Sequence, residues 1–148
     1  MQIERETTIA APVERVWALL TEAEHIGTWF SDAGADVDLR PGGTMVLRWA
    51  EHGTGRARIV DVEPHRRFSY RWAPIPEHWG EDPVEGNSTL VEFTLAAEGD
   101  GTRLRVVESG FEALEGTDEQ RRRSHEDNTE GWETQLGNVR DYAQRVTV

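Results

Sequence analysis

The stretch GWETQLGNVRDYA, residues 131–143, predicts the element around which the rest of the chain is arranged. Its apolar residues recur three or four positions apart, as on one face of an α-helix. This apolar stripe consists of Trp132, Leu136, Val139, Ala143 and Val146. Followed backwards, the same face becomes polar at His125, Asn128 and Thr129. We therefore expect a helix over about 117–146 whose first half is exposed or faces something other than a dry core.

The region before this helix predicts a run of strands. Between Ala33 and Phe111, six stretches alternate in character with the period of two that is typical of β-strands. They are ADVDLR (35–40), MVLRWA (45–50), ARIVDVE (57–63), RFSYRW (67–72), TLVEFTLAAE (89–98) and TRLRVVESGF (102–111). Consecutive strands separated by turn residues indicate a meandering antiparallel sheet, and Asp100-Gly101 is expected to make one tight hairpin turn.

Two short helices are expected after a first strand in residues 2–10. The first helix begins behind Pro12, where apolar residues follow helical spacing. The second contains Thr21 and Glu24, which have the form of a capping box, and is expected to end near Gly27.

This order of elements indicates an α+β fold in which a curved, seven-stranded antiparallel sheet wraps around the long C-terminal helix. Such a sheet is expected to leave a cavity at one end. Phe68, Tyr70 and Trp72 alternate along one strand and would form the cavity wall. Residues 73–86, which contain three prolines and Trp79, would arch over its mouth, because irregular segments of this length are usually lids, binding loops or disordered.

Composition narrows the classes of partner. The 148 residues suit one domain, and 16 basic against 28 acidic residues give a net charge of −12, which disfavours nucleic acid and membrane surfaces as partners. The chain has no cysteine, which suits a reducing compartment, so we expect a cytoplasmic protein. The charged N-terminus does not have the form of a signal peptide, and no apolar run is long enough to span a membrane.

Five motifs carry a family resemblance. They are TTIAAPVERVWALLTEAEHIGTWF (7–30), RPGG (40–43), VDVEPHRRFSYRW (60–72), GDGTRLRVVESGF (99–111) and GWETQLGNVRDYA (131–143). In this order they resemble the SRPBCC, or START-like, superfamily, and within it the branch named for the activator of heat-shock-protein ATPase.

The resemblance implies a helix-grip fold that encloses a pocket for apolar or amphipathic small molecules. It implies no reaction, because the branch has no shared catalytic set to carry over. The chaperone-binding role of the named activator belongs to larger eukaryotic proteins with an additional N-terminal domain, which we do not expect here.

Two titratable residues are weak candidates for catalysis. Glu108 falls on the same strand face as Leu104 and Val106, where a buried acid could bind a hydroxyl or an amine, or shuttle a proton. Alternatively, a bulge or the strand end turns Glu108 to solvent or into a pair with an arginine. His125 would lie on the inner face of the last helix and could act as a base, or it is exposed near the helix start.

Aromatic side chains with a polar tip suit an amphipathic ligand. The expected ligand-binding residues are Trp29, Phe30, Trp49, Tyr70, Trp72, Trp79, Phe93, Glu108, His125, Asn128, Thr129 and Trp132. The histidines show no spacing of a metal-ligand motif, so no metal site is expected, and no cofactor is predicted.

Three functions follow from these observations. The leading interpretation is a binding protein for a small apolar or aromatic molecule, without catalysis. The second is an enzyme resembling the polyketide cyclases, which would use Glu108 or His125 to move protons. The third is an interaction module, either a chaperone accessory or a homodimer, that presents exposed aromatic surface such as the Trp79 segment.

Overall fold

A computed structural model describes residues 1–145, which form a seven-stranded sheet, three α-helices and two short 3-10 helices. In chain order the elements are β1 (Gln2–Ile9), α1 (Val13–Thr21), α2 (Ala23–Trp29), β2 (Ala35–Val37), β3 (Thr44–Trp49), β4 (Gly53–Glu63), β5 (Arg67–Trp72), η1 (Pro76–His78), β6 (Thr89–Glu98), β7 (Gly101–Ser109), η2 (Phe111–Ala113) and α3 (Asp118–Arg145). A strand or helix occurs at each predicted place, although the strand predicted over 35–40 covers only Ala35–Val37 and the one predicted over 102–111 ends at Ser109. Val146 of the predicted stripe lies outside the described residues.

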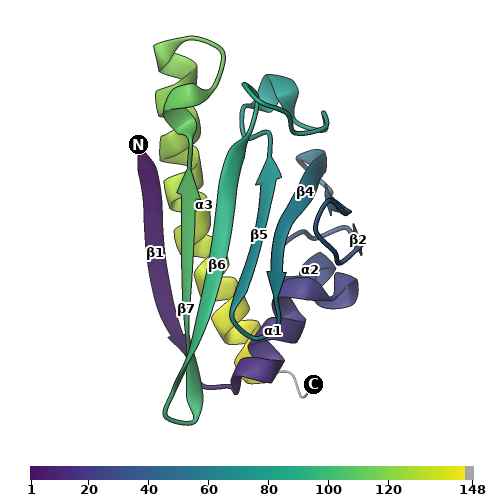
Figure 1. Ribbon diagram of the computed structural model, residues 1–148, viewed down its shortest axis with the longest axis vertical. Coiled ribbons are helices and arrows are strands. Elements are labelled where there is room, and N and C mark those ends of the chain that lie inside the picture. Colours follow the sequence, from purple (N-terminus) through teal and green to yellow (C-terminus); the bar gives the residue numbers. More distant parts are fainter. Residues whose placement is uncertain (146–148) are drawn as a thin grey trace.

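All neighbouring strands pair antiparallel, in the order β1-β7-β6-β5-β4-β3-β2. The helix α3 runs along one face of the sheet, and α1 and α2 lie at one end of it (Figure 1). The irregular segment between β5 and β6 lies at the opposite end, near the start of α3 (Figure 1). This is the predicted helix-grip arrangement, and it gives the space between the sheet and α3 two differently covered ends.

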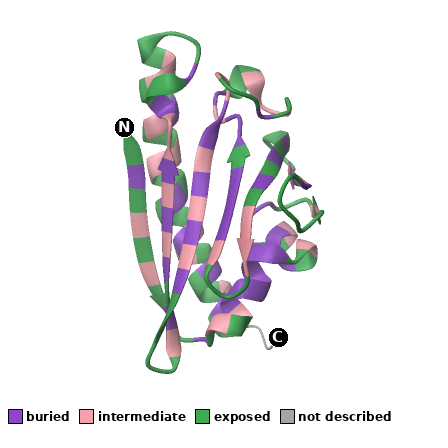
Figure 2. Cartoon of the chain, viewed as in Figure 1, coloured by how far each residue is buried: buried purple, intermediate pink, exposed green. Residues whose placement is uncertain are grey.

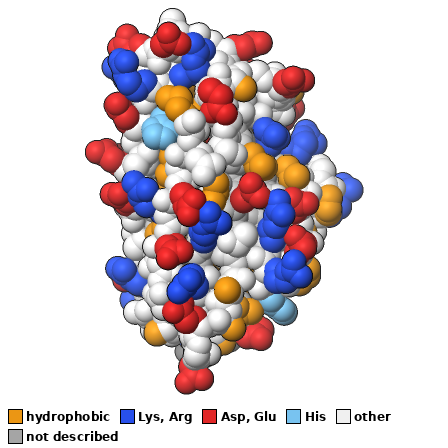
Figure 3. Space-filling model, turned by 60° about the vertical axis from the view of Figure 1, so that its left-hand side comes forward, with side chains coloured by type: hydrophobic (Ala, Val, Ile, Leu, Met, Phe, Trp, Pro, Cys, Tyr) orange, Lys and Arg blue, Asp and Glu red, His pale blue; other side chains and the backbone are white. Residues whose placement is uncertain are grey.

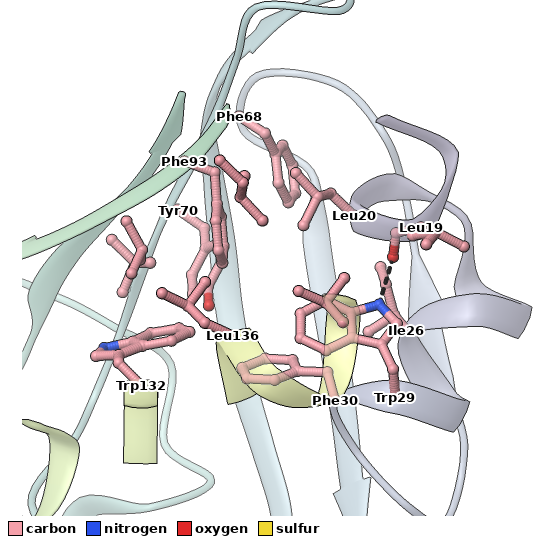
Figure 4. Close-up of a cluster of buried hydrophobic side chains, with 14 of the residues drawn as sticks. Leu19, Leu20, Ile26, Trp29, Phe30, Phe68, Tyr70, Phe93, Trp132 and Leu136 are labelled. Atoms are coloured by element: carbon pink, nitrogen blue, oxygen red, sulfur yellow. Dashed lines mark hydrogen bonds between the residues drawn. The ribbon is translucent and has the colours of Figure 1, made fainter. Parts of the chain in front are cut away.

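Buried residues alternate with more exposed ones along the strands, most clearly in β6 and β7 (Figure 2). The stripe of α3 meets them, and Trp132, Leu136, Val139 and Ala143 are all buried, as predicted. Figure 4 shows Trp132 and Leu136 beside Tyr70 and Phe93 of the sheet. The hydrophobic burial that holds the fold together therefore runs along this line of contact.

Thr21 does not cap the second helix, so that prediction is wrong. It is the last residue of α1, and its Oγ1 donates a hydrogen bond to the carbonyl oxygen of Trp17 at 2.8 Å. The helix α2 also passes Gly27 and ends at Trp29. A Cβ on Gly27 would lie 2.9 Å from the Cα of Gly34, so this glycine permits a close backbone approach rather than ending the helix.

The turn between β6 and β7 lies one residue earlier than predicted. Glu98 pairs with Gly101, which leaves Gly99 and Asp100 as the turn residues. Gly99 has a φ of 60°, whereas Asp100 does not enter the positive-φ region. A glycine with positive φ at the first turn position is the feature of a type II′ hairpin.

A capping box fixes the start of α3. The backbone N–H of Gln120 donates to Oγ1 of Thr117 at 3.1 Å, and the N–H of Thr117 donates to Oε1 of Gln120 at 2.8 Å. Nη1 of Arg121 donates to the carbonyl oxygens of Leu114 and Gly116, at 2.8 and 2.9 Å. These bonds hold residues 114–117, just before α3, in place. This segment lies at the end of the sheet opposite α1 and α2 (Figure 1).

Acidic and basic side chains are interspersed over the face that Figure 3 shows. Some form ion pairs between neighbouring elements, such as Nη2 of Arg105 with Oε2 of Glu4 at 2.8 Å, and Nε of Arg5 with Oε1 of Glu133 at 3.2 Å. None of the helices found in residues 1–145 is both long and apolar enough to cross a membrane.

Candidate functional site

Glu108 lies near the end of β7 with its side chain buried in the interior. It follows Leu104 and Val106 on the buried face of the strand, and it stays in register with Ile3 of β1 and Val91 of β6. The alternation therefore continues through Glu108. Of the two alternatives that the sequence left open, the structure has the inward-facing one.

Four side chains donate hydrogen bonds to the Glu108 carboxylate, from β5, β6 and α3. Oε1 accepts from Nε1 of Trp132 at 2.8 Å and from Nδ2 of Asn128 at 2.9 Å. Oε2 accepts from Oγ1 of Thr89 at 2.6 Å, Nε1 of Trp72 at 2.9 Å and Nδ2 of Asn128 at 3.1 Å. A carboxylate offers about four lone-pair sites, so these contacts occupy it fully.

The partners of Glu108 are neutral donors rather than cations. Among residues 1–145, none of the ion pairs includes Glu108. Charge-assisted hydrogen bonds of this kind are stronger than those between neutral groups. The site is therefore a buried acceptor that indole, hydroxyl and amide groups hold in place without a counter-charge.

Tyr70 places a second polar group near this carboxylate. It is 1% exposed, and its hydroxyl has no hydrogen-bond partner in the part of the chain that the structure describes. Burial, and then the nearby charge of Glu108, raise the pKa of Tyr70 well above its ordinary value. The phenol therefore stays neutral in the folded protein at physiological pH.

A pocket of about 500 Å³ adjoins the wall that carries the donors to Glu108. It lies between the segment after β5, the end of β3 and the middle of α3. Its lining residues are Phe30, Trp49, His52, Trp72, Pro74, Pro76, Trp79, Asp127, Asn128, Gly131, Trp132 and Gln135. Because Trp72, Asn128 and Trp132 also bind Glu108, the carboxylate lies directly behind the pocket wall.

Aromatic rings at several angles form this wall. Phe30, Trp72 and Trp132 are stacked on one another, with centroid distances of 5.7 to 5.9 Å and interplanar angles of 12° to 28°. Trp79 stands at 65° to Trp72 and at 48° to Trp49. Rings in these positions offer a bound molecule both an apolar surface and ring edges.

The irregular segment 73–86 contributes Trp79 to the pocket, and a glycine makes room for the ring. A Cβ on Gly55 of β4 would lie 2.4 Å from Cζ2 of Trp79. Ile75 anchors the same segment because its side chain is buried in the core. The segment thus forms one wall of the pocket.

Six of the predicted ligand-binding residues line this pocket: Phe30, Trp49, Trp72, Trp79, Asn128 and Trp132. Three others lie deeper, where the space between sheet and helix is filled. Trp29, Tyr70 and Phe93 surround a void of only about 10 Å³, together with Phe68, and Trp29 also lines a second pocket of about 640 Å³ between α2 and the end of α3. The wall expected from Phe68, Tyr70 and Trp72 is therefore divided, and only Trp72 reaches the pocket.

His125 and Thr129 do not line the pocket, and the structure does not bring His125 to Glu108. Nε2 of His125 lies 3.3 Å from the carbonyl oxygen of Gln2, and its ring packs against Phe111 with the centroids 5.2 Å apart. Oγ1 of Thr129 donates to the carbonyl oxygen of His125. Successive helical residues point about 100° apart, so these side chains turn toward β1 while Asn128 faces the carboxylate.

Several residues of the site were not predicted from the sequence. Asp127, Gly131 and Gln135 lie on the same helix face as Asn128 and Trp132, so the helical spacing could have found them. Thr89 has no such signal, because its place beside Trp72 depends on how β5 and β6 pair.

A separate group of side chains has the geometry to hold a metal ion. Glu22, Glu24 and His25 have donor atoms within 4.8 Å of one another around the start of α2. The two carboxylates are exposed, and Nδ1 of His25 already lies 2.9 Å from the hydroxyl of Tyr142. None of these residues lines the pocket at the other end. The prediction that the chain has no metal site stays a prediction.

The curved seven-stranded antiparallel sheet, the long C-terminal helix against it and the two short helices after β1 define the helix-grip fold of the SRPBCC, or START-like, superfamily. The chain belongs to the family described as Activator of Hsp90 ATPase homolog 1-like protein, whose family model matches residues 10–144. None of the curated protein sequences matches it significantly.

Solved structures share the whole fold at low sequence identity. Protein MLL2253 from Mesorhizobium loti matches with a TM-score of 0.77 and 23% identity over 100% of both chains. CalU16 from Micromonospora echinospora matches with 0.68 and 26%, over 95% of this chain and 73% of its own. The Aha1 dimer from Colwellia psychrerythraea matches with 0.69 and 20%, over 95% and 94%. These likenesses concern the fold, so the site is argued from this chain.

Proposed function

We propose that this protein binds a small, largely apolar molecule in the pocket between segment 73–86 and α3. The observation that carries the proposal is the pocket of about 500 Å³ with five aromatic side chains in its wall: Phe30, Trp49, Trp72, Trp79 and Trp132. Ligand sites typically have volumes of about 300–1,000 Å³ and combine apolar walls with a few fixed polar groups. We also propose that the chain acts as one cytoplasmic domain, which suits its lack of cysteine.

The polar groups at the pocket wall are held in fixed positions, as a specific binding site requires. Nδ2 of Asn128 is bound to Glu108, and Nε2 of Gln135 donates to the carbonyl oxygen of Phe30 at 3.1 Å. Nε1 of Trp49 donates to the same carbonyl oxygen at 3.1 Å. Side chains fixed in this way lose little further conformational freedom when a ligand binds.

Two features favour binding over catalysis. The carboxylate of Glu108 is fully occupied by protein donors, which leaves no free lone pair to abstract a proton. His125 is turned toward Gln2 and is not among the pocket residues. General acid–base catalysis needs a group within hydrogen-bond reach of the substrate, and neither residue offers this.

The first experiment is native mass spectrometry of gently purified protein, followed by tryptophan-fluorescence titration with the molecule retained or with a panel of small aromatic compounds. Trp79→Ala should weaken binding by about tenfold or more, because it removes one wall of the pocket. Val84→Ala is the matched control, since Val84 lies in the same segment but is 58% exposed and does not line the pocket. Equal affinities for both variants would contradict the proposal.

A second candidate function is self-association. The solved relative from Colwellia psychrerythraea is described as a dimer, and it covers 95% of this chain. We propose a homodimer on this likeness, and with it a role as a chaperone accessory that the family description suggests. Size-exclusion chromatography with light scattering tests the assembly, and a monomer at high concentration would count against it.

A further inference from the structure

The pocket is bordered by negative charge. Asp127 lies exposed at its rim, and Glu108 lies directly behind the wall. No arginine is among the lining residues found in the part of the chain that the structure describes, and the sequence contains no lysine. The one lining side chain in residues 1–145 that protonation can make cationic is His52, so an anionic ligand would enter against two carboxylates without a permanent compensating cation.

Glu108 also acts on the rings of the wall. The indole N–H groups of Trp72 and Trp132 both donate to its carboxylate, at 2.9 and 2.8 Å. A hydrogen bond to an anion polarises its donor, and hydrogen-bonded groups in a low-dielectric interior polarise one another. Donation to Glu108 thus makes both indole rings more electron-rich, which strengthens the attraction between an aromatic ring and a cation.

The amide of Asn128 also favours a ligand with a donor group or a positive charge. Both oxygens of Glu108 accept from its Nδ2, which fixes the orientation of the amide. Its Oδ1 takes part in none of the hydrogen bonds found in residues 1–145, so it remains an acceptor beside the pocket. A ligand meets this acceptor best with an N–H or O–H donor, or with a positive charge.

We propose that the ligand is an organic cation, a protonated amine or a quaternary ammonium group attached to an apolar body. The inference rests on the proposed function and narrows its substrate class. The cationic group binds among the rings of Trp72, Trp79 and Trp132, between the charges of Glu108 and Asp127, and the apolar body fills the rest of the pocket. Glu108 acts through the donors that it holds rather than by direct contact with the ligand.

Two compounds of the same shape test the inference. (4-Hydroxyphenyl)trimethylammonium carries the charge, and 4-tert-butylphenol is its neutral counterpart. Isothermal titration calorimetry on the wild-type protein should show the cation binding about tenfold tighter than the neutral compound, given the strength of a partly desolvated cation–aromatic contact. Equal binding, or tighter binding of the neutral compound, would overturn the inference and leave the pocket's binding function standing. Binding of neither compound, with none retained in native mass spectrometry, would count against both.

Variants show whether the carboxylates produce the preference. Glu108→Gln and Asp127→Asn should each reduce the ratio of the two affinities by several-fold, and the use of a ratio cancels any general weakening of the pocket. Glu126→Gln is the matched control, because it removes one exposed charge from the same helix at a position outside the pocket, and it should leave the ratio unchanged. If Glu108→Gln does not fold, the affinity ratio of the wild type and its change in Asp127→Asn decide whether the pocket prefers a cation and whether a carboxylate produces that preference. A ratio that neither variant changes would overturn the role of the two carboxylates.

Discussion

The two ends of the space between the sheet and α3 are built from the same elements but are covered differently. At one end, the closed end, α1 and α2 add apolar side chains such as Leu20 and Ile26, and the void among the buried side chains is only about 10 Å³. The larger groove at this end, of about 640 Å³, lies outside this core, between α2 and the end of α3. At the other end, which we call the open end, the irregular segment 73–86 covers the space, and a pocket of about 500 Å³ remains. A regular amphipathic helix fills the space beneath it, whereas a proline-rich segment holds one large ring at the edge and leaves a pocket.

The residues that α3 turns toward the sheet differ between the two ends. Leu136, Val139 and Ala143 are buried in the apolar core, whereas Asn128 turns to the buried carboxylate of Glu108. The closed end follows the rule that interiors are apolar and closely packed, and the open end departs from it. Departures of this kind are expected at functional sites, where the surrounding structure compensates for them.

The largest effect on stability is expected at the open end, from Glu108→Ala. The variant leaves four buried donors without their acceptor, which should lower the free energy of unfolding by about 3–5 kcal/mol. Urea denaturation measures this loss. Glu4→Ala is the control, because Glu4 is an exposed partner of Arg105 and should cost far less. Similar losses for the two variants would show that the buried carboxylate does not organise the open end.

At the closed end, Leu20→Ala should lower the free energy of unfolding by about 3 kcal/mol, because the side chain is almost fully buried and its removal leaves a cavity. The same denaturation experiment measures it, with Val60→Ala on the outer face of β4 as a nearly neutral control. A loss below about 1 kcal/mol would mean that this end is less tightly packed than its small void indicates.

A smaller effect of opposite sign is expected from Tyr70→Phe. The hydroxyl is buried without a partner, so its removal should raise the free energy of unfolding by about 1 kcal/mol near neutral pH. Thermal and urea denaturation measure the change. A clear loss of stability would mean that the hydroxyl has a partner in solution, such as a bound water or ligand group.

Tyr70 also predicts a dependence on alkaline pH. The unfolded chain begins to release the phenolic proton near pH 10, whereas the folded protein retains it because burial raises the pKa of Tyr70. The stability that comes from this group is therefore complete below pH 10 and is lost as the pH rises above that value, by about 1.4 kcal/mol per pH unit. Unfolding curves at pH 8 and pH 11 should show a smaller drop for Tyr70→Phe than for the wild type. Equal drops would contradict the shift.

The smallest change in stability is expected from Gly55→Ala, which acts on the open end alone. The added methyl group occupies the place of the Trp79 ring, so the segment 73–86 must move while the core stays packed. We expect a loss of about 1 kcal/mol or less, since the affected segment is irregular and lies at the surface. Tryptophan emission should shift to longer wavelength, and an unchanged spectrum would contradict the displacement.

Most of the fold could be predicted because its signals are local. The period of RFSYRW and the helical spacing of residues 132–143 each indicate which face of an element is buried. The helical stripe was confirmed, and Phe68, Tyr70 and Trp72 are buried as predicted, although Ser69 between them is buried as well. The predicted ends of elements were less accurate. Thr21 and Glu24 fit a capping box, but Thr21 bonds within the preceding helix, because the two short helices follow each other almost without a break.

The site could be predicted only in part. The inward face of Glu108 was one of two alternatives, and Trp72 and Asn128 were among the candidates, since face and period are local properties. That these side chains meet at one carboxylate depends on strand register and helix rotation, which a single sequence does not specify. A rotation of one position separates Asn128, which binds Glu108, from Thr129, which does not.

The convergence on Glu108 has a consequence for how the chain assembles. Its donors lie 19, 20, 24 and 36 positions away in the sequence, so the carboxylate is satisfied only after β5, β6, β7 and α3 have all come together. A slip of β7 by one residue would turn Glu108 outward and bring Val107 inward. The donors would then be left without an acceptor. The buried carboxylate thus penalises a one-residue slip of β7 against its neighbours and so helps to specify the native register of this part of the sheet.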